Sequence, residues 1–300
     1  MTMFVLAHIS DIHLSYPPTF SELSPKRLVG LANWHFNRKR YFSNSTAIML
    51  INDILLHKVD HISITGDIVN FTCKREISAA THWLKSIGKP HDISIVPGNH
   101  DVYVIGSQER SLSEWKNYIT SDSCLSDSKK KKLFPYLRIR DNIALIGCST
   151  AIATPPFTAN GYFGQEQADD TSKLLRKAKK EGLFRVIMMH HPPILGTISV
   201  CNRMFGIKRF KKMIWDEGAE LILHGHTHLN SLYWMNSYKK LIPVVGIASA
   251  SQKINTDKPQ ASYNLFYIEK KHECWKIIRE RYTISPDYLS IQKKCSDIFS

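Results

Sequence analysis

The chain of 300 residues lacks any apolar run near the 20 or so residues that a bilayer-spanning helix needs. It also lacks a basic amino-terminal region followed by an apolar segment and a small-residue cleavage site, so no signal peptide is predicted. Linkers rich in proline or glycine and low-complexity stretches are absent, while 43% of the residues are apolar. These absences predict one large domain in a soluble, cytoplasmic protein.

Cysteine and acidic residues are both in short supply. The six cysteines lie far apart and form no CxxC pair, which argues against a thiolate zinc site and gives little support to a disulfide framework. Lys and Arg number 40 against 26 Asp and Glu, for a net charge of +14. This charge favours an anionic partner (a phosphorylated substrate, nucleic acid or an acidic membrane), although a solvated cationic surface explains it equally well. No recognised nucleic-acid motif accompanies the charge.

The chain does contain five short polar clusters, each directly after an apolar run of strand length. The runs are residues 4–7, 61–65, 92–96, 185–189 and 220–223. The clusters that follow them are Asp11-Ile12-His13, Gly66-Asp67, Gly98-Asn99-His100-Asp101, His190-His191 and Gly225-His226-Thr227-His228. Open α/β sheets place their sites beyond the carboxyl ends of the strands, so we expect the clusters to meet at one edge.

Alternating strand and helix patterns predict a layered α/β fold. Helices are expected at residues 46–57, 77–87, 171–181 and 207–217, and late antiparallel strands at 231–238, 241–247, 263–268 and 274–282. Two basic helical insertions are expected at about 16–42 and 107–137, the second containing the lysine run 129–132. We predict one domain over residues 1–283 and a carboxyl-terminal tail, either a short helix or disordered, over 284–300.

The polar clusters have the spacing of metal ligands. Asp11 and His13 are two residues apart, so in an extended segment both side chains share a face and can bind the same ion. His226 and His228 repeat this spacing, although a loop could send one imidazole to each of two ions. Asp67 follows a glycine that lets the chain turn sharply off the strand, which makes its carboxylate the best candidate to bridge two ions.

Asn99 and His190 add an amide oxygen and a ring nitrogen to this set. Nitrogen and oxygen ligands without thiolate suit Mn, Fe, Zn or Co better than Mg or Ca. Two such ions about 3.5–4 Å apart clamp the attacking and leaving oxygens of a displacement at phosphorus and supply a hydroxide nucleophile. His100 would stabilise the phosphoryl charge or protonate the leaving group, and Asp101 would hold that imidazole in place.

The series from Asp11 to His228 resembles that of the calcineurin-like metallophosphoesterases. The resemblance implies a four-layer αββα sandwich, two mixed sheets flanked by helices, with a binuclear metal site at one edge. It assigns Asp11, His13, Asp67 and His228 to the first metal and Asp67, Asn99, His190 and His226 to the second. It makes His100 the catalytic histidine. The family's pattern of His followed two residues later by Pro selects His190 over His191, which becomes a neighbour of the substrate.

Substrate specificity must then come from the insertions. In the first insertion, Trp34 and the nearby Arg38 are suited to stack on a base, pack on an acyl chain or lie at a membrane interface. The plainer alternative is an amphipathic helix that covers the core with its charges in water.

Several substrate hypotheses stay open. The DxH, GD, GNHD and GHxH pattern is similar to that of class III cyclic nucleotide phosphodiesterases, which implies a phosphodiester substrate. A second resemblance, to calcineurin-like UDP-2,3-diacylglucosamine hydrolases, implies a pyrophosphatase peripheral to the inner membrane surface, although His100 stands where one branch has Arg. A nuclease or nucleic-acid-binding protein and a scaffold without catalysis are the remaining alternatives.

Overall fold

A computed structural model describes residues 3–14, 16, 18–122, 132–254, 256–272, 274–285, 287 and 290–299. The first of two six-stranded sheets consists of β1 (Phe4–Ile9), β2 (His61–Ile64), β3 (Ile93–Ile95), β12 (Ser262–Lys271), β13 (Cys274–Ile284) and β14 (Ile291–Phe299). Its order is β14-β13-β12-β1-β2-β3. The strands β1, β2 and β3 run parallel, and β12 to β14 continue the sheet as antiparallel neighbours.

The second sheet is also mixed. It consists of β4 (Tyr136–Arg140), β5 (Ile143–Gly147), β7 (Phe184–Met188), β9 (Leu221–His224), β10 (Ser231–Asn236) and β11 (Leu241–Gly246). The order is β10-β11-β9-β7-β5-β4, with antiparallel strands at both edges and four parallel strands between them. A separate two-stranded sheet pairs β6 (Gly161–Tyr162) with β8 (Met204–Phe205).

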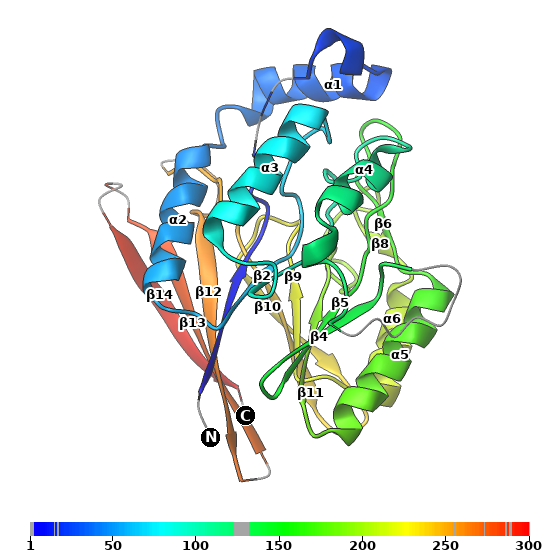
Figure 1. The fold of residues 1–300 in the computed structure, drawn as a ribbon, viewed down its shortest axis with the longest axis vertical. Helices are drawn as coiled ribbons and strands as arrows, with labels where there is room; N and C mark the ends of the chain where they lie inside the picture. Colours follow the sequence, from blue (N-terminus) through cyan, green and yellow to red (C-terminus); the bar gives the residue numbers. More distant parts are fainter. Residues whose placement is uncertain are drawn as a thin grey trace.

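Helices cover the outer faces of the two sheets (Figure 1). The first sheet is flanked by α2 (Asn44–Leu56) and α3 (Lys74–Ile87), and the second by α5 (Gln165–Lys180) and α6 (Ile207–Glu217). The four correspond to the helices expected at 46–57, 77–87, 171–181 and 207–217. The predicted four-layer αββα sandwich is therefore confirmed.

The apolar strand runs reflect burial on both faces. In β7, Val186 and Met188 pack into the cluster between the sheets, whereas Ile187 packs beneath the helices. Successive side chains of a strand point to opposite faces, so a strand enclosed on both sides has no polar alternation. These strands end abruptly in polar residues, which puts the polar clusters at the sheet edge.

The first insertion folds as three short helical segments, η1 (Phe20–Glu22), α1 (Pro25–Asn33) and η2 (Trp34–Arg38), of which η2 is a π-helical turn. Ser24 caps α1 by accepting a hydrogen bond from the backbone N–H of Arg27, and Pro25 occupies the first helical position. In Figure 1, α1 lies across one end of the molecule, and both chain termini lie at the opposite end. The basic helix expected in this insertion is therefore present, continued by the π-helical turn.

The second insertion contains α4 (Ser107–Glu114) and the short 3-10 helix η3 (Lys116–Tyr118) before β4. Of the lysine run 129–132, only Lys132 lies within the described residues. Among the described helices, none is both long enough and apolar enough to cross a membrane.

The carboxyl-terminal segment differs from the expected tail. Residues 291–299 form β14, which pairs with β13 from Ile284↔Ile291 to Ile277↔Phe299. Opposite charges face each other across this pair: Arg279 Nε donates to Asp297 at 3.0 Å, and Lys293 Nζ to Glu280 at 2.9 Å. Cross-strand charge pairs stabilise an edge strand whose sequence has no clear apolar alternation.

Candidate active site

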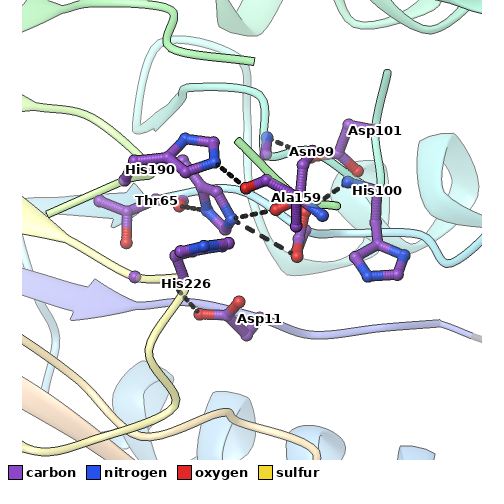
Figure 2. A network of polar contacts seen from close by, with 12 residues as sticks. Asp11, Thr65, Asn99, His100, Asp101, Ala159, His190 and His226 are labelled. Atoms are coloured by element: carbon purple, nitrogen blue, oxygen red, sulfur yellow. Dashed lines mark hydrogen bonds and ion pairs between the residues drawn. The ribbon is translucent and has the colours of Figure 1, made fainter. Parts of the chain in front are cut away.

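The five polar clusters meet where the carboxyl ends of the parallel strands of both sheets converge. From the first sheet come Asp11 and His13 after β1, Asp67 after β2, and Asn99 with His100 after β3. From the second sheet come His190 after β7, and His226 with His228 after β9. Figure 2 shows part of this network, with His190, Asn99, His226 and Asp11 gathered around one centre. The clusters therefore meet beyond the carboxyl ends of the strands, as expected.

The carboxylates and imidazoles lie within reach of shared ions. Asp67 Oδ2 is 3.4 Å from His190 Nε2 and 3.9 Å from His13 Nε2. Asp11 Oδ1 is 3.2 Å from His228 Nε2. Two groups, Asp11 with His13 and His228, and Asp11 with Asp67 and His190, each place their ligand atoms within 4.8 Å of one another. Each group could hold one ion, and Asp11 belongs to both groups.

Backbone carbonyls orient the ring nitrogens of the second group. His190 Nδ1 donates to the Thr65 carbonyl at 2.7 Å, which leaves Nε2, 3.2 Å from Asn99 Oδ1, as the nitrogen that a metal ion would take. His226 Nε2 lies 2.9 Å from the Asn202 carbonyl, which leaves Nδ1 as the nitrogen available to a metal. Metal-binding histidines characteristically donate their second N–H to such an acceptor.

The expectation of an extended Asp11–His13 segment is wrong, because the ligand backbones adopt left-handed conformations. The φ angles are 55° at Asp11, 50° at His13, 53° at Asp67, 68° at His226 and 55° at His228. Non-glycine residues avoid this region, and such strain persists at functional sites when surrounding contacts enforce it. Here the N–H of Asp11 donates to the Gly66 carbonyl at 3.0 Å and that of His13 to the Asp67 carbonyl at 2.9 Å.

Two glycines allow the clusters to approach this closely. A Cβ at Gly66, where φ is +98°, would lie 2.6 Å from both Gly98 N and His190 Nδ1. A Cβ at Gly98 would overlap the Asp67 carboxylate. The glycines of the GD and GNHD clusters therefore permit the second and third strand ends to touch.

The buried carboxylates require a positive partner. Burial raises the pKa of Asp67, but the charge of His190 outweighs it and holds that pKa well below its usual range. Burial likewise lowers the pKa of His190, but Asp67 and Asp11 raise it to about 9. Asp11 Oδ1 and His13 Nδ1 are buried without hydrogen-bond partners among the described residues. Unpaired oxygen and nitrogen donors around two carboxylates fit divalent transition metals.

His100 lies beside this ligand set with both ring nitrogens engaged. Its Nδ1 is 2.7 Å from the Asn70 carbonyl, and its Nε2 is 2.9 Å from Arg38 Nη1. Arg38 Nη2 also reaches His13 Nε2 at 3.2 Å. Burial and the Arg38 guanidinium lower the pKa of His100 to about 4, so the ring is neutral near pH 7.

Asp101 does not contact the His100 imidazole, whose orienting partner is instead the Asn70 carbonyl. The Asp101 carboxylate accepts three backbone N–H groups, from Ile68 at 2.9 Å, Val69 at 3.1 Å and Gly98 at 2.8 Å. It thus ties the loop after β2 to the loop after β3, and so holds Asp67 and Asn99 in register.

A cavity of about 490 Å³ opens over the metal ligands. Arg38, Phe42, Ile198, Leu229 and Lys258 line it together with Asp67, Asn99, His100, His226 and His228. Of the three expected substrate contacts, only Arg38 is among its lining residues.

The other two expected substrate residues lie elsewhere. Trp34 is half-buried, and Lys39 Nζ lies 5.6 Å from its ring centre. His191 is buried, with Nδ1 2.8 Å from Thr150 Oγ1 and Nε2 3.0 Å from the Ala159 carbonyl. Its ring centre is 4.2 Å from that of His226, so His191 packs behind a metal ligand.

Some functional groups carry no sequence signal. Asn70, Thr65 and Asn202 act through backbone carbonyls, which any residue possesses. Tyr103, whose ring stacks on His100 with ring centres 5.5 Å apart, is two residues beyond the GNHD cluster. Its closeness to that cluster in the sequence is the one signal that could have identified it.

Comparison with solved structures supports this fold. A dimetal phosphatase from Danio rerio aligns over 97% of this chain and 98% of its own, with a TM-score of 0.63 and 12% identity. A purple acid phosphatase from yellow lupin (Lupinus luteus) seeds aligns over 99% of this chain and 53% of its own, with a TM-score of 0.58 and 11% identity. At such identities the likeness shows the fold alone.

No curated protein matches the sequence. The sequence pattern of the calcineurin-like phosphoesterase family matches residues 4–230, a span that includes every expected metal ligand. The chain therefore belongs to the calcineurin-like phosphoesterase family, as a phosphoester hydrolase with a site for two metal ions.

Proposed function

We propose that the protein hydrolyses a phosphodiester, and the Arg38 guanidinium is the observation that carries this proposal. Arg38 points from the insertion to His100 and His13, and no carboxylate forms an ion pair with it in the described part of the chain. The guanidinium lies beside His100 and the expected ligand His13, where it can pair with the single negative charge of a diester. A cavity open to solvent leaves room for a substituent on each side of phosphorus.

The chain's own groups account for substrate positioning. Asp11, Asp67, Asn99 and the four expected histidine ligands would hold the ions. When bound, two divalent ions polarise the phosphoryl group and activate water. Arg38 donates to a non-bridging oxygen, which is a stronger acceptor than the imidazoles that it contacts without substrate. His100 Nε2, which contacts Arg38 Nη1, would face the reacting group, while the Asn70 carbonyl fixes the ring tautomer.

A cyclic nucleotide is the specific diester that we propose to test first. The Phe42 ring lines the cavity and lies 5.1 Å from the Arg38 guanidinium. An aromatic face beside a cation suits a nucleobase attached to a phosphate. Hydrolysis of 3′,5′-cyclic AMP by manganese-loaded protein should exceed that of bis(p-nitrophenyl) phosphate. A slower rate with cyclic AMP would remove this substrate.

A second candidate is a UDP-2,3-diacylglucosamine pyrophosphatase acting in the cytoplasm at the membrane surface. It is favoured by the apolar part of the cavity lining, Phe42, Ile198, Leu229 and Pro259, which provides contact area for an acyl chain. Release of UMP from this lipid in mixed micelles would support it. Hydrolysis of cyclic AMP without UMP release would exclude it.

The variant Arg38→Met tests whether the Arg38 guanidinium binds the substrate, on which the proposal rests. A charge-assisted hydrogen bond contributes about 1.5–3 kcal/mol, so kcat/KM for bis(p-nitrophenyl) phosphate should fall about 10- to 100-fold. Lys39→Met removes a neighbouring charge that is absent from the cavity lining and should change kcat/KM less than about twofold. Equal effects of the two variants would contradict the role of Arg38.

A further inference from the structure

Five apolar side chains at one end of the molecule are exposed to water. We call them the apolar rim, and they are Phe20, Leu28, Phe36, Ile105 and Phe157. Phe20 is 93% exposed, Phe36 76%, Ile105 94% and Phe157 87%. Single exposed apolar residues are ordinary, but a cluster of large ones marks an interaction surface.

The rim residues come from segments that pack together. Phe36 and Phe157 line a common groove of about 460 Å³, which the Tyr103 ring also borders. Lys26 Nζ joins these segments, since it donates to the Tyr103 carbonyl at 2.7 Å and to Thr154 Oγ1 at 3.3 Å. Ile105 follows Tyr103 by two residues. The rim is thus one surface built from α1, η2 and two loops.

Phe20 and Leu28 belong to the same insertion as Phe36. Phe20 lies in η1, and the N–H of Lys74 ties that turn to α3 through Glu22 Oε1 at 2.7 Å. Figure 1 shows α1 across one end of the fold, with the chain termini at the other.

The insertion that carries Phe20, Leu28 and Phe36 is basic. Residues 16–42 contain five Lys and Arg and a single acidic residue, Glu22. The Glu22 carboxylate is engaged by backbone N–H groups of Lys74 and Thr19. Lys39 and Arg40 are exposed, and the Arg40 guanidinium lies 4.7 Å from the Tyr41 ring centre. Apolar and aromatic side chains with interleaved cations are the composition of surfaces that bind anionic membranes.

The rim also borders the entrance to the active site. Phe36 and Arg38 are two residues apart in η2, yet Phe36 lines the rim groove and Arg38 lines the catalytic cavity. A surface that covers the rim therefore lies next to the mouth of the cavity.

We infer that the apolar rim docks on an anionic lipid bilayer. Phe20, Phe36, Ile105 and Phe157 enter the boundary between headgroups and acyl chains, while Lys39 and Arg40 contact acidic headgroups. Charge complementarity favours this occupant over a neutral bilayer or an acidic-rimmed protein groove, because the first insertion is basic and its one acidic residue, Glu22, is engaged. The inference goes beyond the proposed hydrolysis and holds whichever phosphoester is the substrate.

Co-sedimentation of the full chain with vesicles tests the inference. Vesicles of phosphatidylcholine with about 30% phosphatidylglycerol should bind the protein at low salt and release it as salt rises. Burying a phenyl ring contributes enough that Phe36→Ser with Phe157→Ser should weaken binding at least about tenfold. Leu56→Ser is the matched control, because Leu56 is 79% exposed at the end of α2, outside the rim.

Three results would overturn the inference. The first is equal vesicle binding by the rim variant and the Leu56→Ser control. The second is binding to pure phosphatidylcholine as strong as to the anionic vesicles. The third is a dimer in sedimentation velocity that the rim variant converts to monomer, which would assign the rim to a second copy. Hydrolysis of soluble bis(p-nitrophenyl) phosphate should be unchanged in the rim variant, so loss of docking is distinguishable from failure of the proposed chemistry.

Discussion

The two sheets contribute different chemistry to the same site. The first sheet supplies both expected carboxylate ligands, Asp11 and Asp67, together with the amide of Asn99 and the imidazole of His13. The second supplies only imidazoles, those of His190, His226 and His228. The expected carboxylate ligands therefore come from one sheet, and the other sheet offers imidazoles alone.

This division shows how the site is held together. The carboxylates carry the charge that would attract metal ions, so we expect the first sheet to set the metal affinity of the centre. In the second sheet, backbone carbonyls orient His190 and His226, which would complete the coordination. A backbone contact joins the halves, since the N–H of His226 donates to Asp11 Oδ2 at 3.1 Å. Substitutions in the two sheets should consequently fail in different ways.

The largest effect is expected from Asp67→Asn in the first sheet. Loss of the bridging charge should reduce metal content below two ions per chain and lower kcat for diester hydrolysis by about 10³-fold or more. Metal analysis after gel filtration and turnover of bis(p-nitrophenyl) phosphate measure the two effects. Asp216→Asn, at an exposed carboxylate on α6, should alter neither. Full metal content in Asp67→Asn would contradict the assigned bridge.

A smaller effect is expected from His226→Gln in the second sheet. The carboxylates stay in place, so the variant should bind metal about 10- to 100-fold more weakly and regain much of its activity in excess manganese. Asp67→Asn should not be rescued in this way. Metal titrations of activity for the two variants check the contrast, and an equal lack of rescue would show that the sheets do not differ.

The third effect is steric and tests the contact between neighbouring strand ends. Gly98→Ala places a Cβ against the Asp67 carboxylate and should lower kcat by about tenfold or more while the chain stays folded. Gly164→Ala, whose Cβ would lie 3.1 Å from the exposed Tyr162 ring, is the control. Steady-state kinetics measure the activity of both variants, and circular dichroism shows whether they are folded. Wild-type kinetics in Gly98→Ala would mean that the loop can move to accommodate the added Cβ.

The smallest effect on activity is expected at the opposite end of the second sheet. Glu220 accepts hydrogen bonds from Arg185 Nε and Nη2, each at 2.9 Å, and from Lys240 Nζ at 3.0 Å. Glu220→Gln leaves a buried guanidinium without its counter-ion and should lower the free energy of unfolding by about 3 kcal/mol. The specific activity of the folded protein should be unchanged. Urea unfolding measures the free energy of unfolding, and steady-state kinetics measure the specific activity. Unchanged stability or a reduced specific activity would contradict the prediction.

The same pair predicts a pH dependence. Burial raises the pKa of Glu220, but hydrogen bonds and the charge of Arg185 outweigh it and hold that pKa below its ordinary 4.5. Because the folded pKa is depressed, the stabilisation is present above pH 4.5 and is lost as pH falls through the folded value. Wild-type protein should lose stability more steeply than Glu220→Gln below about pH 5. If the free energies of unfolding of the wild type and of Glu220→Gln fell equally with pH, the ion pair between Glu220 and Arg185 would be contradicted.

The strand ends were predictable because each apolar run is bounded by a polar cluster, often with glycine. The runs before Asp11, Asp67 and His226 all form buried strands, and the expected ligands converge beyond them. Two-sided burial makes such runs easy to recognise. The amphipathic insertion was also visible in its helical spacing and its basic residues.

Other features depend on contacts that the sequence does not display. β14 is stabilised by partners on β13, such as Arg279 with Asp297, rather than by its own alternation. Asp101 caps backbone N–H groups across two loops, and the Asn70 carbonyl orients His100. The left-handed backbone of the ligands arises from the close approach of neighbouring strand ends. Each of these features depends on contacts between residues that are far apart in the sequence, so it can be recognised only after the fold is known.

The most direct test of the account is a titration of metal-free protein with Mn²⁺, followed by electron paramagnetic resonance. Two ions bridged by Asp67 and about 3.5–4 Å apart should give a spin-coupled dimanganese spectrum that saturates at two equivalents. Diester hydrolysis should rise with that signal. Uncoupled Mn²⁺ alone at two equivalents, or activity that saturates at one, would contradict a binuclear centre shared by the two sheets.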